Sequence, residues 1–134
     1  MKIELASNLN NIDKNQWNEL NACNHPFTSY DFLNALEISH SVSSKTGWTP
    51  KHILVKTDDN TIIGASPNYL KMHSYGEYIF DHSWANAFEN AGGQYYPKLL
   101  SAIPFTPATG PRILLNPKNK DNEEILKLII DTYE

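Results

Sequence analysis

The residues best suited to chemistry gather in the segment 71–84, where carboxylates and histidines alternate with aromatic side chains. On a strand, side chains alternate between two faces, so Tyr75 and Glu77 would share one face. One interpretation is a half-buried strand whose aromatic face enters the core. The other is the wall of a cleft, in which Glu77 and Asp81 orient a polar substrate and one of them acts as a general base. The residue pattern alone favours the first interpretation and leaves the second open.

A second candidate is the proline-rich segment 104–112. Pro104, Pro107 and Pro111 predict an irregular, stiff loop, because proline fixes the backbone and donates no hydrogen bond. The loop carries Arg112, the only arginine of the chain. Arginine forms two parallel hydrogen bonds with a carboxylate or a phosphate. The segment is therefore either an anion-binding loop or a stiff surface crossover with Arg112 in solvent.

Residue spacing disfavours several other kinds of site. The five histidines stand at no metal-ligand spacing from one another or from Cys23, so we expect no metal site. His25 lies two residues from Cys23, but nothing marks an activated nucleophile, and a structural cysteine is favoured. Neither glycine-rich phosphate-binding motif occurs, and Gly92-Gly93 is placed to end a helix rather than to open one.

The composition indicates one small globular domain. The chain has 134 residues and a net charge of −4, from 11 basic and 15 acidic side chains. Because the basic residues form no stripe, we expect no surface that follows a nucleic-acid backbone and no DNA partner. A single cysteine excludes an intramolecular disulfide and fits a reducing compartment. No apolar run is long enough for a signal peptide or a membrane span, so we expect a cytoplasmic protein.

The elements that must position these residues are predicted from apolar periodicity, turn residues and helix caps. Asp13, Thr28 and Ser83 are the predicted N-caps, and the helix after Ser83 has an apolar stripe that includes Trp84 and Phe88. The predicted elements are strand 2–5, helix 13–22, helix 28–40, a loop at 41–50, hairpin strands 52–56 and 61–65, strand segments 68–72 and 75–80, helix 83–91, strand 99–105, strand 112–115 and a helix from 121. This order predicts an α+β (mixed α/β) fold, a mostly antiparallel mixed sheet flanked by helices.

Five stretches of the chain, in the same order, resemble the motifs of one bacterial family. They are NHPFTSYDFLNALE at 24–37, TGWTPKH at 46–52, YLKMHSYGEYIFD at 69–81, YYPKLL at 95–100 and PFTPATGPR at 104–112. Together they cover roughly residues 24–115. The chain resembles the N-terminal part of the FemAB-like peptidoglycan biosynthesis/recognition family of predicted N-acyltransferases.

The resemblance implies a GNAT-type acyltransferase fold, which full-length members use twice in tandem. We therefore expect residues 1–134 to form a single, truncated N-terminal GNAT-like lobe. The predicted final helix has no cap at Glu134, which fits that expectation. A missing second lobe or a homo-oligomer would then be the partner. Two features depart from the family pattern: Asn68 replaces a small or apolar residue, and the usual glycine-rich pyrophosphate loop is absent.

The resemblance also implies a reaction, the transfer of an acyl or aminoacyl group to an amine, with a small molecule or a peptidoglycan precursor as acceptor. Acyl-CoA or aminoacyl-tRNA would be the donor, and we expect no tightly bound cofactor. Attack by a neutral amine needs a base and hydrogen-bond donors for the developing oxyanion. The candidate residues are Glu77 or Asp81 as the base, Tyr75 and Tyr78 as donors, and Lys98 with Arg112 for an anionic substrate group.

Other functions remain open for these 134 residues. The chain alone is expected to be inactive if the donor site needs the second lobe. The alternative is a non-catalytic fragment or recognition module that binds cell-wall precursors or packs on the missing lobe. Such a module would expose an apolar patch at a sheet edge. A small-molecule binding domain is a third, weaker alternative.

Overall fold

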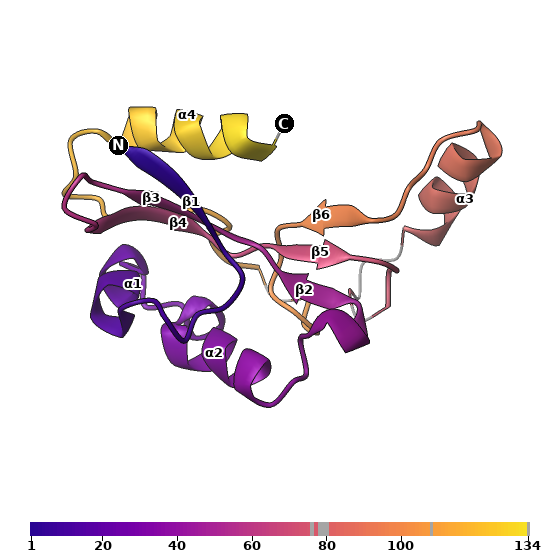
Figure 1. Cartoon of the computed structure of the whole chain (residues 1–134), viewed down its shortest axis with the longest axis horizontal. Helices are drawn as coiled ribbons and strands as arrows, with labels where there is room; N and C mark the ends of the chain where they lie inside the picture. Colours follow the sequence, from indigo (N-terminus) through magenta and orange to yellow (C-terminus); the bar gives the residue numbers. More distant parts are fainter. Residues whose placement is uncertain (76, 78–80, 108, 134) are drawn as a thin grey trace.

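The computed structural model describes residues 1–75, 77, 81–107 and 109–133 (Figure 1). In chain order the elements are β1 (Lys2–Ala6), α1 (Lys14–Leu20), η1 (Pro26–Thr28), α2 (Tyr30–Ile38), η2 (Ser44–Thr46), β2 (Trp48–Pro50), β3 (His52–Lys56), β4 (Ile62–Ser66), β5 (Tyr69–Lys71), α3 (His82–Asn90), β6 (Lys98–Leu100), β7 (Leu114–Leu115) and α4 (Asn122–Tyr133). The strands described form two antiparallel sheets. The α+β prediction is therefore confirmed.

The larger sheet has the strand order β1-β3-β4-β7 and carries helices on both faces. In Figure 1, α1 and α2 lie on one face and α4 on the other. Because successive side chains of β3 point to opposite faces, Leu54 joins the core cluster of Trp17, whereas Ile53 and Val55 pack in the cluster of Ile129. A strand covered on both faces is apolar at consecutive positions, and β3 has that character.

The smaller sheet has the order β2-β5-β6 and a core of Val42, Trp48 and Tyr69. The sequence analysis assigned residues 41–50 to a loop, and the structure corrects this at β2. Trp48 lies opposite Lys71 in the register of β2 with β5. A three-residue strand that contains a proline has little local signal, and its pairing with β5 decides its conformation.

The strand predicted over 75–80 is wrong at Tyr75 and Glu77, which lie outside any strand. The remaining positions of that prediction, 76 and 78–80, lie outside the described residues. The chain leaves β5 at Lys71 and turns, and two contacts stabilise the turn. The Tyr75 N–H donates to His73 Nδ1 at 3.1 Å, and Lys71 Nζ donates to the Tyr75 carbonyl at 2.7 Å. The side chains thus bend this segment back over β5 instead of extending it.

The helix caps give a mixed outcome. Asp13 caps α1, since its Oδ1 accepts from the Gln16 N–H at 3.0 Å, as predicted. The Gln16 side chain takes no part in this cap. Its Oε1 accepts the Ile62 N–H of β4 at 2.8 Å. The predicted cap Thr28 is wrong: Ser29 caps α2, and the Thr28 hydroxyl donates to a buried asparagine instead.

Helix α3 stands apart from both sheets at one end of the molecule (Figure 1). It begins at His82 after Asp81, so the predicted cap Ser83 is wrong. Only Ala85 of this helix is buried, whereas Trp84 is 77% exposed. Among the described residues, no helix combines the length and apolar character needed to cross a membrane.

Candidate functional site

Four of the six predicted site residues line one cavity of about 580 Å³. They come from three separate places: Glu77 and Asp81 precede α3, Lys98 begins β6, and Arg112 precedes β7. The other lining residues are Tyr95, Leu99, Leu100, Ser101 and Ala102. The fold therefore brings together side chains that lie up to 35 positions apart in the sequence.

The two predicted tyrosines are placed differently. Tyr75 is 70% exposed and lines a neighbouring cavity with His73 and His82. Its ring packs against the His73 ring, with centroids 5.0 Å apart. Tyr78 lies outside the described residues. The role of both tyrosines as hydrogen-bond donors stays a prediction.

Alternating charges form the wall of the cavity. Glu77 lies between two ammonium groups, with Lys71 Nζ 3.1 Å from Oε2 and Lys98 Nζ 2.8 Å from Oε1. Lys98 also forms an ion pair with Asp81 Oδ2. The order Lys71, Glu77, Lys98, Asp81 leaves no two like charges adjacent. Each carboxylate is therefore neutralised before a substrate enters.

Lys71 is the residue that the sequence analysis missed. Its side chain is completely buried, and the ammonium also lies 3.7 Å from the centroid of the Trp48 ring. Burial lowers the pKa of Lys71, and the hydrogen bond and charge of Glu77 oppose that shift. A signal was present, since alternation along β5 places Lys71 on the same face as the buried Tyr69. A cation on a buried face requires a carboxylate partner.

Asp81 combines an ionised carboxylate with one unpartnered oxygen. Burial acts to raise the pKa of this carboxyl, but hydrogen bonds from Lys98, Ser74 and Tyr95 outweigh it and hold the pKa well below its usual range. The Tyr95 hydroxyl and Lys98 Nζ both donate to Oδ2. Oδ1 is buried and accepts no hydrogen bond from the described residues. Asp81 lines the cavity, and this oxygen lies just beneath the cavity surface.

Lys98 is held as an ammonium by the groups around it. Burial acts to lower its pKa, but hydrogen bonds to Asp81 and Glu77 raise it above the ordinary value. The ammonium also donates to Ser74 Oγ at 3.1 Å. These contacts direct its protons at protein atoms. In the structure, Lys98 therefore neutralises Glu77 and Asp81. The contact of Lys98 with an anionic substrate group stays a prediction.

Arg112 is the lining cation that is not engaged by a carboxylate of the described residues. Its guanidinium donates to the Gly110 carbonyl at 3.1 Å and forms no ion pair with the described residues. The charged lining residues are two carboxylates, Glu77 and Asp81, and two cations, Lys98 and Arg112, and of the two cations Lys98 is the one paired with the carboxylates. An anionic group would therefore be attracted to this side chain.

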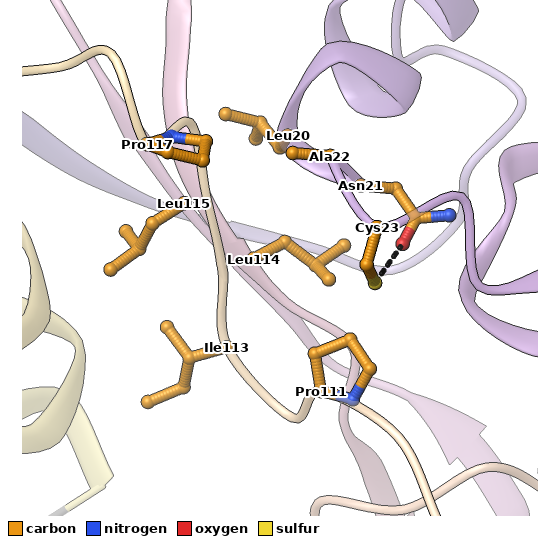
Figure 2. A pocket seen from close by; sticks show the side chains of 9 residues that line it. All are labelled: Leu20, Asn21, Ala22, Cys23, Pro111, Ile113, Leu114, Leu115 and Pro117. Carbon is orange, nitrogen blue, oxygen red and sulfur yellow. Dashed lines mark hydrogen bonds between the residues drawn. The ribbon is translucent and has the colours of Figure 1, made fainter.

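A second cavity, of about 200 Å³, lies between the end of α1 and the strand β7. Figure 2 shows that leucine, isoleucine and proline side chains form most of its wall, with Cys23 at one side. Cys23 is exposed, and its thiol lies 3.9 Å from Asn21 Oδ1. Apart from the Cys23 thiol, the side chains that line this cavity are not ionisable. Within the described part of the chain, no three His, Cys, Asp or Glu side chains are grouped to hold a metal ion.

Comparison with known proteins gives one match. The model of the FemAB-like family matches residues 8–134. The description of that family is peptidoglycan biosynthesis/recognition. No curated protein and no solved structure matches the chain. The matched range includes every charged residue that lines the larger cavity.

Proposed function

The chain belongs to the FemAB-like family of peptidoglycan biosynthesis and recognition, and from this membership we propose that its charged cavity binds the amine acceptor of an N-acyl transfer. The acceptor is an amine of a peptidoglycan precursor. The donor is a thioester such as acyl-CoA or an ester such as aminoacyl-tRNA. The family supports the cell-wall role, and the cavity supports the chemistry.

One observation carries the proposal: Asp81 Oδ1 is a buried carboxylate oxygen without a partner among the described residues. An amine or ammonium that entered the cavity would donate to it. Glu77 Oε2 is also buried without a hydrogen-bond partner, but it lies 3.1 Å from Lys71 Nζ, and Glu77 Oε1 lies 2.8 Å from Lys98 Nζ. Glu77 is the weaker candidate because both of its oxygens already face an ammonium. We therefore assign contact with the acceptor to Asp81 and the placement of the lysines to Glu77.

The transfer follows from that placement. The nitrogen of the amine forms a bond to the acyl carbon, and the bond from that carbon to sulfur or oxygen breaks. The proton of the nitrogen passes to Asp81 Oδ1 and then to the departing thiolate or alkoxide. A bound substrate that excludes water from the cavity raises the pKa of a carboxylate and makes it a better base. Arg112 holds an anionic group of the acceptor.

Recognition without transfer is the second candidate function, and the low pKa of Asp81 favours it. Lys98, Ser74 and Tyr95 keep this carboxylate ionised. An ionised carboxylate binds an ammonium well, but a low pKa makes it a weak base. A recognition module would therefore bind the precursor and release no product.

The experiment measures release of free thiol from acyl-CoA, or of free tRNA from aminoacyl-tRNA, with the full chain and a lysine-containing peptide as acceptor. Asp81→Asn should lower turnover by about a hundredfold or more, the usual contribution of a general base. Asp131→Asn is the control, because that carboxylate is exposed and pairs with Lys127 on α4. Melting temperatures identify any variant that fails to fold.

Three results are decisive. Loss of turnover in Asp81→Asn alone supports the assignment. Equal turnover in the wild type and Asp81→Asn removes Asp81 from the mechanism. Peptide binding without any thiol or tRNA release by the wild type overturns transfer by this chain and establishes the recognition function.

A further inference from the structure

Strand β1 is one edge of the larger sheet, because it pairs with β3 and with no other described strand. It is the longest of the four edge strands described, with five residues against three in β2 and β6 and two in β7. Figure 1 shows β1 nearest the viewer, with no described helix or strand over it. The outer side of an edge strand has backbone N–H and C=O groups that are free to pair with another strand.

The charges of β1 are only partly balanced within the chain. Lys2 lies directly opposite Lys56 in the register of β1 with β3, and it forms no ion pair with the described residues. Lys56 pairs with Glu4 instead, with Nζ 2.8 Å from Oε2, and the Glu4 side chain is still 49% exposed. Like charges opposite each other destabilise a sheet. The edge therefore has a cation that lacks a carboxylate.

We propose that β1 pairs with β1 of a second copy of this chain, antiparallel and with the two Ile3 residues opposite each other, and so forms a two-fold symmetric dimer. In this register Lys2 of each copy lies opposite Glu4 of the other. No residue of β1 lines the charged cavity, so the dimer is independent of the proposed function.

The charges of β1 select this register. When two identical strands pair about a two-fold axis, the residue at the axis lies opposite itself, and every other pair follows from it. Lys2 at the axis would place two lysines together, and Glu4 at the axis would place two glutamates together. Leu5 or Ala6 at the axis would leave Lys2 without a charged partner. Among the residues of β1, only Ile3 at the axis gives two pairs of opposite charge.

The same register brings exposed apolar side chains together. Leu5 is 61% exposed and Met1 is 43% exposed. Alternate residues of a strand share a face, so both lie on the face from which Ile3 packs against the core cluster of Ile129. With Ile3 at the axis, Met1 of each copy lies opposite Leu5 of the other. The dimer therefore extends the apolar layer beneath α4 from one copy into the next.

Sedimentation equilibrium of the full chain over a range of concentrations measures the dimer. The mass should rise from the 15.2 kDa of one chain toward twice that value. Lys2→Glu should weaken dimerisation by about tenfold or more, because it turns both pairs of opposite charge into pairs of like charge. Within one copy this change removes the like charge opposite Lys56, so it should not weaken the fold. Lys45→Glu, at an exposed position of η2, changes the net charge equally and should leave the dimer intact.

A second variant gives a test by complementation. Glu4→Lys alone also creates two pairs of like charge, so it should weaken dimerisation as Lys2→Glu does. An equimolar mixture of the two variants should form a heterodimer, because an acidic edge then faces a basic edge. Circular dichroism establishes that each variant is folded.

Three results would overturn the inference. They are a wild type that stays monomeric up to about 1 mM, a dimer that Lys2→Glu weakens no more than Lys45→Glu does, and a mixture of Lys2→Glu with Glu4→Lys that stays monomeric. These failures are separate from failure of the transferase. A chain that dimerises through β1 and transfers no acyl group would reject catalysis and support the dimer, and an active monomer would do the reverse.

Discussion

Lys71 of β5 and Lys98 of β6 occupy directly opposite positions in the smaller sheet, and the carboxylate of Glu77 lies between their ammonium groups. Like charges opposite each other across two strands destabilise a sheet. Here Glu77 offsets that repulsion, because its carboxylate forms an ion pair with each of the two ammonium groups. The Glu77 side chain is only 7% exposed. The same carboxylate thus holds together the sheet edge and the charged wall of the cavity.

Replacing this carboxylate should therefore be costly. Glu77→Gln leaves the two opposed ammonium groups with one carboxylate, Asp81, which pairs with Lys98. We expect a loss of about 3 kcal/mol in the free energy of unfolding, the usual cost of breaking a buried ion pair. Urea denaturation measures it.

The double variant Lys71→Met with Glu77→Gln separates charge from packing. Removal of the second cation should restore part of the lost stability, because Lys98 keeps Asp81 as its partner. Glu89→Gln, at an exposed position of α3, is the control and should change stability by less than about 0.5 kcal/mol. A stable Glu77→Gln single variant would contradict the bridging role.

The low pKa of Asp81 predicts how stability depends on pH. A carboxyl with a pKa lower in the folded than in the unfolded chain binds protons more tightly when unfolded, so it stabilises the fold above its unfolded pKa of about 4. That contribution is lost as the pH falls toward the folded pKa. The stability difference between the wild type and Asp81→Asn should therefore be largest near neutral pH and shrink between about pH 5 and pH 2.

Urea denaturation at a series of pH values measures this difference. Asp131→Asn is compared in parallel, since its carboxylate is exposed on α4. A difference between the wild type and Asp81→Asn that stays constant down to pH 2 would show that Asp81 is not held ionised by Lys98 and Tyr95.

Local patterns in the sequence predicted a good part of the fold. The hairpin of β3 and β4 follows from two apolar runs around Asp58-Asp59-Asn60, and the cap of α1 follows from Asp13. Both depend on residues within a few positions of one another. The cap of α2 was misplaced by one residue because Thr28 and Ser29 are equally suited to capping, and tertiary contacts of Thr28 decide between them.

The site could be predicted only in part, because its geometry depends on strand register. Residue types pointed to Glu77, Asp81, Lys98 and Arg112, and the structure places all four around one cavity. Alternation along β5 marks Lys71 as buried, but Lys71 was missed because its partner Glu77 lies outside any strand and is placed by the turn after β5.

The predicted apolar stripe of α3 leads to a stability prediction for two tryptophans. Trp84 is 77% exposed, whereas Trp17 is completely buried and donates its indole N–H to the Thr28 carbonyl at 3.0 Å. Trp84→Ser should change the free energy of unfolding by less than about 0.5 kcal/mol. Trp17→Ala should cost about 3 to 5 kcal/mol. Urea denaturation of both variants checks the contrast, and a large loss in Trp84→Ser would show that α3 packs against the rest of the chain.

The buried pair of Glu37 and His52 gives the last prediction. His52 Nδ1 accepts the backbone N–H of Asn68 at 3.2 Å, so the ring proton is on Nε2, which donates to Glu37 Oε2 at 2.8 Å. Glu37 Oε1 accepts the Leu9 N–H at 2.8 Å. The carboxylate thus joins α2 to β3 and to the chain before α1. The backbone N–H of Asn68 thus fixes the histidine tautomer.

Glu37→Gln keeps the shape of this side chain but has only one acceptor oxygen. If that oxygen bonds to Leu9, the amide N–H groups face the N–H of His52, and two donors oppose each other. A switch of the ring tautomer would relieve this contact but would then oppose the Asn68 N–H. We therefore expect a loss of about 1 to 3 kcal/mol, the cost of one unsatisfied buried polar group. Urea denaturation measures it against Glu19→Gln at an exposed position of α1, and the ring ¹⁵N shifts of His52 report the tautomer. Unchanged stability together with an unchanged tautomer would show that Glu37 does not accept from both groups at once.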